Sequence, residues 1–373
     1  MHRAERMPLS VRMVRMLDAL REPGSLLLLT GPDLDLTLRV LRRAKLLGLV
    51  AQRLAPAQLA QLPARVVDQL ESARNMVEAR VRLARWELWH LARVLQPAPT
   101  QPVVLLKGCA YLLLALPHAV GRMLTDVDLL VPEDQLRDAE AQLQQFGWES
   151  TPLSPYDERY YRDWTHEIPP LRHVEREIEV DVHHNILMRT ARLHPAASKL
   201  LASARVVGSD GFQVLAPTDM VLHAMTHLFY SSEMDDALRE LVDIDALVRH
   251  FAAIEPGFWS GFAARAGELD LLRPATYALR YVRRWLLTPV PAEVLQQLEG
   301  ASPPAPILAL MDCLVPHALF PRHPDRPERR SALVRLLLLA RLHWIRMPPL
   351  LLARHLGRKL RGRLRPPPVM AKS

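Results

Sequence analysis

Short segments near the middle of the chain show the hydrophobic pattern of β-strands. Residues 126–131 begin as an alternation of Asp with Val, and residues 177–183 alternate polar side chains with Ile and Val throughout. Because successive side chains of a strand point to opposite faces, this pattern predicts two strands with one polar face each. Apolar runs at residues 103–106, 171–174 and 212–215 are predicted to add short strands, and 171–174 should form a hairpin with 177–183.

Most of the remaining chain has helical periodicity. Apolar residues recur three or four positions apart in residues 33–62 and most clearly in the long amphipathic segment 66–95. Similar segments follow at residues 132–145, 217–229, 239–249 and 258–287. The predicted fold class is therefore α+β, with a small mixed β-sheet core flanked by N-terminal and C-terminal helical regions.

Length and composition agree with a globular protein of two or three units. Of 373 residues, 49% are hydrophobic and 24% are charged, and 32 prolines interrupt the helical segments. Proline-rich breaks precede the first strand and follow the last long helical segment. We predict four regions, namely an N-terminal helical region at 1–100, a β-containing core at 101–216, a C-terminal helical region at 217–320 and a basic Leu/Arg-rich tail at 321–373.

The predicted strands gather three carboxylates. Asp126 and Asp128 share one face of their strand, and Asp181 lies on the polar face of the other. Like charges on one face repel each other unless a cation lies between them. If the two strands are neighbours, the three carboxylates form a site for Mg²⁺, or for Mn²⁺, together with substrate phosphates.

Other polar residues flank these acids. Lys107 and Gly108 follow the first apolar run, where the lysine could neutralise a phosphate and the glycine could let backbone amides approach it, although an ordinary exposed lysine is an equal alternative. Arg122 is expected to contact a phosphate, to support the site or to act as the counter-ion of Asp126. Thr125 is expected to orient Asp126.

Histidines add two further expectations. His183 should point towards the acids, whereas His184 should point to the opposite face, so this pair does not predict a zinc site, and the sequence has no HExxH, CxxC or other tight ligand cluster. His223 and His227 are one helical turn apart, either as a packed pair or with His227 lining the site. Asp243 is expected to pair with Arg239 at the same spacing, and the aromatic segment 151–170 should be a loop or short helix near the site.

This order of residues resembles the nucleotidyltransferase superfamily that includes DNA polymerase beta and kanamycin nucleotidyltransferase. The closer resemblance is to the bacterial "uncharacterised nucleotidyltransferase" family, whose pattern is Leu-Lys-Gly, then Arg with Asp-hydrophobic-Asp, then Asp-hydrophobic-His. The matching positions here are 106–108, Arg122, 126–128 and 181–183, and the likeness extends to about residue 251. Cys109, where the wider superfamily usually has Ser, and a long gap before Asp126 depart from the pattern.

The resemblance implies a metal-dependent enzyme that moves an NMP from an NTP to an acceptor hydroxyl, which can belong to a small molecule, a sugar, a protein or RNA. Its alternatives are a non-catalytic binding or scaffold protein of the same fold and a metal-dependent phosphoesterase. Retention of all three acids disfavours the scaffold, and the Lys-Gly turn disfavours the phosphoesterase. The implied catalytic and metal-binding residues are Asp126, Asp128 and Asp181, and the implied substrate-binding residues are Lys107, Gly108, Arg122, His183 and His227.

The tail carries most of the excess positive charge. Residues 322–365 have thirteen Arg and Lys but only Asp325 and Glu328, a net charge of +11, whereas the whole chain has +8. Interleaved leucines and Trp344 suit an anionic membrane surface; the charge alone suits RNA; or the arginines snorkel over the protein itself. We expect a docking element outside the site of the acids.

Cysteine content and the chain termini bear on location. Only Cys109 and Cys313 occur, so neither a disulfide framework nor a cysteine-ligated zinc is predicted. Residues 1–16 lack the apolar core of a signal peptide, and residues 26–29 are too short to cross a bilayer. We expect a cytoplasmic protein without a transmembrane segment, with peripheral attachment to the inner membrane depending on the tail.

Overall fold

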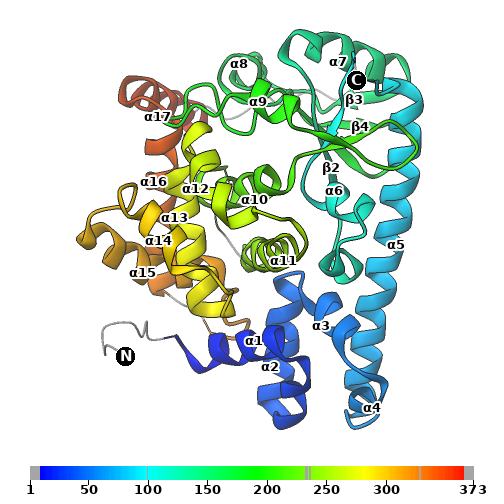
Figure 1. The fold of residues 1–373 in the computed structure, drawn as a ribbon, viewed down its shortest axis with the longest axis vertical. Coiled ribbons are helices and arrows are strands. Elements are labelled where there is room, and N and C mark those ends of the chain that lie inside the picture. Colours follow the sequence, from blue (N-terminus) through cyan, green and yellow to red (C-terminus); the bar gives the residue numbers. More distant parts are fainter. Residues whose placement is uncertain (1–8, 99, 232–233, 235–236, 327–328, 365–373) are drawn as a thin grey trace.

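The structure is a computed structural model that describes residues 9–98, 100–231, 234, 237–326 and 329–364. A seven-stranded mixed sheet lies among helices from both ends of the chain (Figure 1), which confirms the predicted α+β class. The buried apolar side chains form one continuous core across all four predicted regions, whose limits stay a prediction.

The N-terminal region is helical, as predicted. Its longest helix, α5, runs along one edge of the molecule from the N-terminal helices to the sheet (Figure 1). Residues 66–95 were the predicted helix, and α5 begins only two residues earlier. The elements of this region are α1 (Val11–Arg21), η2 (Pro23–Leu28), α2 (Gly31–Arg43), α3 (Leu47–Arg53), α4 (Pro56–Leu59) and α5 (Ala64–Leu95).

The sheet has the strand order β3-β4-β5-β2-β1-β7-β6. The central pair β2 and β5 is parallel, β1 joins β2 antiparallel, and β4 forms the predicted hairpin with β5. The strands are β1 (Val104–Leu105), β2 (Asp126–Leu130), β3 (Trp148–Ser150), β4 (Leu171–His173), β5 (Glu179–His183), β6 (Arg205–Val206) and β7 (Gln213–Val214).

The register of β2 and β5 separates an apolar face from a polar one. Val127 lies beside Val180, and both side chains are completely buried. The helices α5 and α7 (Leu136–Gln145) contact these two strands. Asp128 lies beside Asp181 on the other face, so the strand period places the acids on adjacent strands.

Short helices connect the strands, and longer helices complete the C-terminal region. The π-helical turn η5 directly continues α10, where the sequence pattern predicted one uninterrupted helix. The connecting elements are α6 (Lys107–Leu113), η3 (Pro117–Gly121), η4 (Glu133–Gln135), α8 (Pro155–Trp164) and α9 (Ala197–Ala202). The C-terminal elements are α10 (Pro217–Thr226), η5 (His227–Ser231), α11 (Leu238–Ile254), α12 (Phe258–Glu268), α13 (Leu272–Tyr281), η6 (Val282–Leu286), α14 (Ala292–Glu299) and α15 (Ala305–Leu319).

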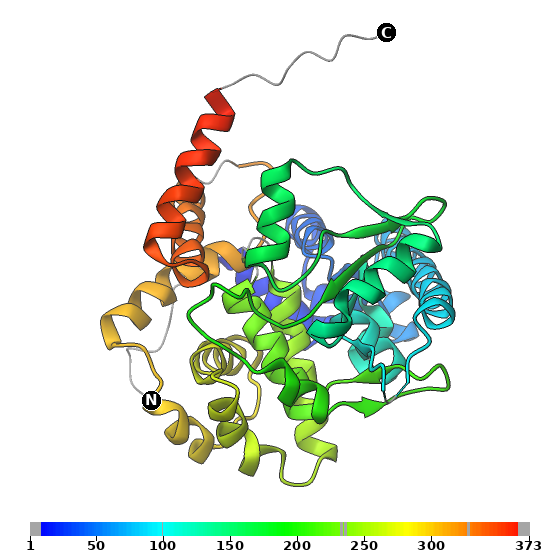
Figure 2. The same ribbon diagram turned by 90° about the horizontal axis from the view of Figure 1, so that it is seen from above.

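The basic tail forms α16 (Arg329–Arg346) and α17 (Pro349–Leu364), on the side of the molecule away from α5 (Figure 2). Several of its arginines contact the protein itself: Arg341 donates to the carbonyl of Phe229 at 3.0 Å, and the guanidinium of Arg358 lies 4.5 Å from the Tyr156 ring. These contacts favour the covering interpretation for this part. Residues 327–328 and 365–373 lie outside the described residues.

None of the helices described is both long and apolar enough to cross a membrane. The expected cytoplasmic location stays a prediction.

A buried ionic contact joins α5 to the sheet. The carboxylate of Glu87, which is only 1% exposed, accepts hydrogen bonds from Trp148 Nε1 at 2.8 Å and from Arg176 Nε at 2.6 Å. The Arg176 guanidinium also lies 4.4 Å from the Trp148 ring. One carboxylate therefore neutralises a buried cation and satisfies an indole N–H.

We expect Glu87→Ala to lower the free energy of unfolding by about 3–5 kcal/mol, because it leaves the buried Arg176 charge without a partner. Glu71→Ala, at an exposed position of the same helix, should change it by no more than about 0.5 kcal/mol. Urea denaturation of both variants measures the difference. If both substitutions lower the free energy of unfolding equally, the buried contact of Glu87 does not stabilise the packing of α5 on the sheet.

Candidate active site

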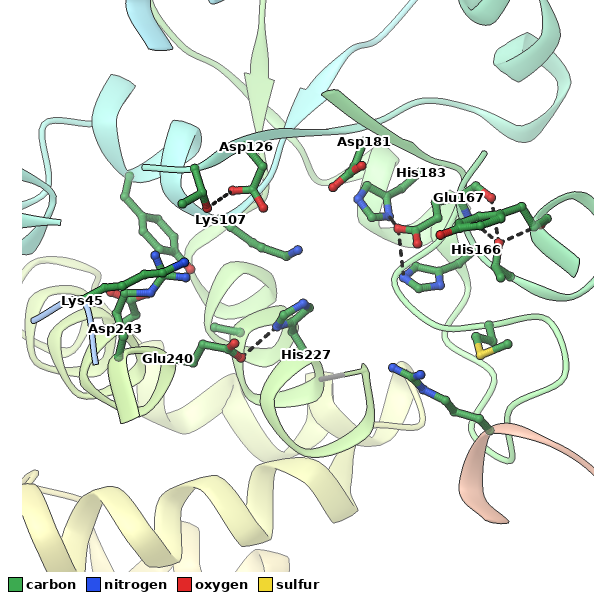
Figure 3. A pocket seen from close by; sticks show the side chains of 18 of the residues that line it. Lys45, Lys107, Asp126, His166, Glu167, Asp181, His183, His227, Glu240 and Asp243 are labelled. Atoms are coloured by element: carbon green, nitrogen blue, oxygen red, sulfur yellow. Dashed lines mark hydrogen bonds and ion pairs between the residues drawn. The ribbon is translucent and has the colours of Figure 1, made fainter. Parts of the chain in front are cut away.

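A cavity of about 520 Å³ opens on the polar face of the sheet, between β2 and β5 on one side and α10 and α11 on the other (Figure 3). Its size is within the usual range for a small-molecule site. The side chains around it are mostly charged or polar. They are Lys45, Lys107, Tyr111, Arg122, Thr125, Asp126, Tyr160, Tyr161, Thr165, His166, Glu167, Asp181, His183, Met188, Ala224, His227, Arg239, Glu240, Asp243 and Arg346.

The three aspartates lie together at this cavity, as their strand parity predicted. Asp126 and Asp181 line it, while Asp128 lies between them in the sheet and is only 2% exposed. Thr125 Oγ1 donates to Asp126 Oδ1 at 3.0 Å, which confirms the predicted orienting contact. The Sγ of Cys109 donates to the backbone carbonyl of Asp126 at 3.7 Å. This contact links α6 to the first residue of β2.

The buried Asp128 carboxylate is compensated by two neighbours. Lys107 Nζ donates to Asp128 Oδ1 at 2.6 Å, and His183 Nε2 lies 3.1 Å from the same oxygen. Burial alone would raise the pKa of Asp128, but the Lys107 charge and the His183 contact hold it well below its usual value. His183 therefore points towards the acids, and His184 instead contacts the Thr165 carbonyl at 3.2 Å, as their opposite faces require.

Asp181 has the opposite electrostatic environment. Burial and then the negative charge of Asp128 raise the pKa of Asp181 to about 8. Among the described residues its Oδ1 is buried without a hydrogen-bond partner. A proton on Asp181 relieves this repulsion, and so would a cation between the two carboxylates.

The acids and the unpartnered Asp181 oxygen suit a divalent ion. Oxygen ligands from two or three carboxylates beside a cavity are the donors that Mg²⁺ and Mn²⁺ favour. In this structure the Lys107 cation balances the charge of Asp128. The residues that could hold the ion are Asp126, Asp128 and Asp181.

Arg122 has a different partner from those expected. Its Nε donates to Asp243 Oδ2 at 2.9 Å, and both side chains are less than a tenth exposed. Arg239, the predicted partner of Asp243, instead donates to the Met123 carbonyl at 2.8 Å. The predicted Arg239–Asp243 pair is therefore wrong, because Asp243 pairs with Arg122 instead. Arg122 is thus not the counter-ion of Asp126 by direct contact.

Gly108 is buried beneath the cavity wall. A Cβ atom there would lie 2.3 Å from Arg122 Nη1 and 2.5 Å from Leu124 Cδ2. The close approach of these two side chains leaves no room for a Cβ atom at this position, and phosphate contact by Gly108 stays a prediction. Lys107, the residue before Gly108, has a left-handed backbone with φ of 45°. This conformation turns the chain from β1 into α6.

The two helical histidines differ in exposure. His227 lines the cavity and its Nδ1 lies 2.9 Å from Glu240 Oε2, whereas His223 is buried. Despite burial, the charge and hydrogen bond of His227 lower the pKa of Glu240. Burial, and then the Lys107 charge, hold the pKa of His223 well below its usual value. Substrate contact by His227 stays a prediction.

Several cavity residues escaped the sequence analysis. Lys45 comes from the turn between α2 and α3, Arg239 from α11, and Arg346 from the end of α16. The expectation that the tail lies wholly outside the site of the acids is thus wrong at Arg346. Glu167 and His166 lie in the aromatic segment that was expected near the site, but no local pattern distinguished them. All five reach the cavity from segments far from the aspartates in sequence, so no local pattern could predict their position there.

The raised pKa of Asp181 generates a pH-dependent prediction. The native state keeps this proton up to about pH 8, whereas the unfolded chain loses it near 3.8, so the free energy of unfolding falls as pH rises between these values. Asp181→Asn removes this contribution and should raise Tm relative to wild type more at the upper end of the range than at the lower. Thermal melts across it measure the change, with Asp138→Asn at an exposed position of α7 as the control. A wild-type pH profile in Asp181→Asn would contradict the assignment.

The comparison with known families agrees with this geometry. The model of a family described as an uncharacterised nucleotidyltransferase matches residues 30–287. The match spans more than half of the chain and includes the strands β1, β2 and β5 and the helices α10 and α11 around the cavity. No curated protein and no solved structure matches the chain. The chain therefore belongs to the uncharacterised nucleotidyltransferase family.

Proposed function

We propose that this protein transfers an NMP group from an NTP to an acceptor hydroxyl, using divalent metal held by Asp126, Asp128 and Asp181. The carrying observation is the register that places Asp128 beside Asp181, with Asp126 two residues away on the same face. In the reaction the acceptor oxygen bonds to the α-phosphorus, the bond to the β-phosphate bridging oxygen breaks, and pyrophosphate leaves. A bound Mg²⁺ or Mn²⁺ would stabilise charge on the attacking and leaving oxygens.

Cationic residues around the cavity support the proposal that it binds an NTP. Lys45, Lys107 and Arg239 line the cavity from three different elements. Burial and the nearby Arg239 lower the pKa of Lys45, although Asp126 acts in the opposite direction; this is the response expected of cations held close together with too little negative charge beside them. A triphosphate would supply the missing negative charge, and Lys107 could exchange Asp128 for a phosphate oxygen.

Asp181 supports the acceptor end. Burial and the charge of Asp128 raise the pKa of its carboxyl group to about 8, so without a metal it holds a proton near neutral pH; a divalent ion beside it would displace that proton, and the carboxylate could then receive the proton of the acceptor hydroxyl. The alternative role of Asp181 is to position that hydroxyl through the metal. The identity of the acceptor is left to experiment.

The test is to incubate the purified protein with each labelled NTP, Mg²⁺ and cell extract. We expect a labelled acceptor and pyrophosphate, and Asp126→Asn should reduce the transfer at least about a hundredfold by removing charge stabilisation of the transition state. The exposed Asp138→Asn should leave it unchanged. Release of inorganic phosphate would instead indicate a phosphoesterase. NTP binding without turnover would indicate the non-catalytic alternative.

We further propose that the exposed apolar face of α16 contacts an anionic membrane surface. Leu333, Leu336 and Leu337 are each about half exposed or more, at 59%, 61% and 46%, on a helix with no acidic residue in its first turn. An RNA partner would not need these leucines.

Sedimentation of the full chain with anionic liposomes, at low and high salt, tests the membrane proposal. Leu336→Glu should reduce the bound fraction several-fold because it places a charge at the apolar contact. Leu28→Glu, at an 84% exposed position of the N-terminal region, is the matched control. Binding to RNA that Leu336→Glu does not weaken, without liposome binding, would contradict this proposal.

A further inference from the structure

A cluster of two histidines and a glutamate lies at the end of β5, beside the aspartates. Residues 166–168 run antiparallel to this end: His184 N donates to the His166 carbonyl at 2.8 Å, and Ile168 N donates to the Val182 carbonyl at 3.1 Å. Glu167 thereby pairs with His183 across the two segments. The backbone thus brings His166, Glu167 and His183 to one place on the cavity wall, as Figure 3 shows.

The three side chains have the spacing of metal ligands. Each offers one ligand atom, and these atoms all lie within 4.8 Å of one another. Ligands bound to one tetrahedral Zn²⁺ at about 2.0–2.2 Å lie about 3.3–3.6 Å apart, so side-chain rotations must bring the most distant of these atoms closer by on the order of 1 Å. The two imidazole rings are 5.2 Å apart between centroids.

The hydrogen bond of His183 directs a lone pair into this cluster. Because a carboxylate only accepts hydrogen bonds, the contact of 3.1 Å between His183 Nε2 and Asp128 Oδ1 places the proton of the neutral ring on Nε2. In the neutral ring His183 Nδ1 is then an acceptor that faces Glu167 Oε2 at 3.2 Å. Two acceptors at this distance repel each other, and either a proton on Nδ1 or a metal ion between the two atoms would relieve that repulsion. A carboxylate that binds the far nitrogen is also the usual support of a metal-bound histidine.

Buried ring nitrogens that make no hydrogen bond provide a second observation. His183 is 4% exposed by side chain, and its Nδ1 makes no hydrogen bond with any described residue. His166 Nδ1 is likewise buried and unpartnered in this part of the chain. An unsatisfied buried polar atom is costly, and a metal ion would satisfy the His183 nitrogen.

We propose that His166, Glu167 and His183 bind a transition-metal ion of the Zn²⁺ class, at a site separate from the aspartates. Two imidazoles with one carboxylate suit Zn²⁺ or Co²⁺ rather than Mg²⁺, which favours oxygen ligands. Three protein ligands leave a coordination position open towards the cavity, where a water molecule or a substrate oxygen can bind. This inference goes beyond the nucleotide transfer proposed above and needs no nucleotide.

The proposed site differs from one made by the His183-His184 pair. Those two side chains have different partners, as predicted, and His183 instead lies beside residues sixteen and seventeen positions earlier in the chain. That separation is why no local motif predicted the cluster.

The direct test is a Co²⁺ titration of the full-length protein after treatment with a chelator. We expect one Co²⁺ per chain, with the visible absorption of cobalt bound by nitrogen and oxygen ligands, displacement by Zn²⁺ and no displacement by a large excess of Mg²⁺. Absence of the band in the wild-type protein, or its loss on adding Mg²⁺, overturns the proposal whether or not the protein transfers nucleotides.

Variants then assign the ligands. His166→Ala and Glu167→Gln should each weaken Co²⁺ binding by more than about tenfold, with circular dichroism melts confirming that both fold. The controls are the same substitutions at exposed positions, His194→Ala and Glu175→Gln. Asp126→Asn should keep the cobalt band. If Asp126→Asn loses the band and His166→Ala keeps it, the ion binds at the aspartates and the proposal fails.

Discussion

The buried carboxylate of Asp128 is the constraint on which the site depends. It is 2% exposed on a central strand, where an unpaired charge would be strongly destabilising. Its compensation comes from both neighbouring strands: Lys107 lies two residues after the end of β1, and His183 ends β5. The strand order β5-β2-β1 is therefore the arrangement that places a cation and an imidazole beside this one carboxylate.

Charge balance extends from this point across the cavity. The Lys107 cation satisfies Asp128 but not Asp181, whose pKa is raised to about 8 by burial and then by the charge of Asp128. On the far wall, Arg122 and Asp243 neutralise each other, and Glu240 Oε2 lies 2.9 Å from His227 Nδ1. The aspartates of β2 and β5 thus carry more negative charge than Lys107 balances. This excess of negative charge favours cation binding beside them.

The helices of the tail belong to the same unit as the sheet. Arg341 and Arg346 of α16 reach the carbonyls of Phe229 and Tyr230 in η5, the turn that continues α10. Arg346 also lines the cavity. Since η5 carries His227, the basic tail contacts the very turn that places this histidine, while leucines on the outer face of α16 remain exposed.

The sequence by itself determined five of the seven strands, the polar faces of β2 and β5, and the family pattern, but not the short edge strands β3 and β6. A strand period of two is a local property of the backbone, so Asp126 and Asp128 had to share a face, and Asp181 had to share one with His183. Helical periodicity likewise located α5 to within two residues.

Only the tertiary structure decided which charged groups meet. Arg122 pairs with Asp243, 121 residues away, although Arg239 lay one helical turn from that aspartate. Lys45, Glu167 and Arg346 reach the cavity from elements whose placement depends on packing of the whole chain. The physical reason is that side-chain alternation follows from neighbouring backbone torsions, whereas an ion pair or ligand cluster depends on strand order and helix packing between distant segments.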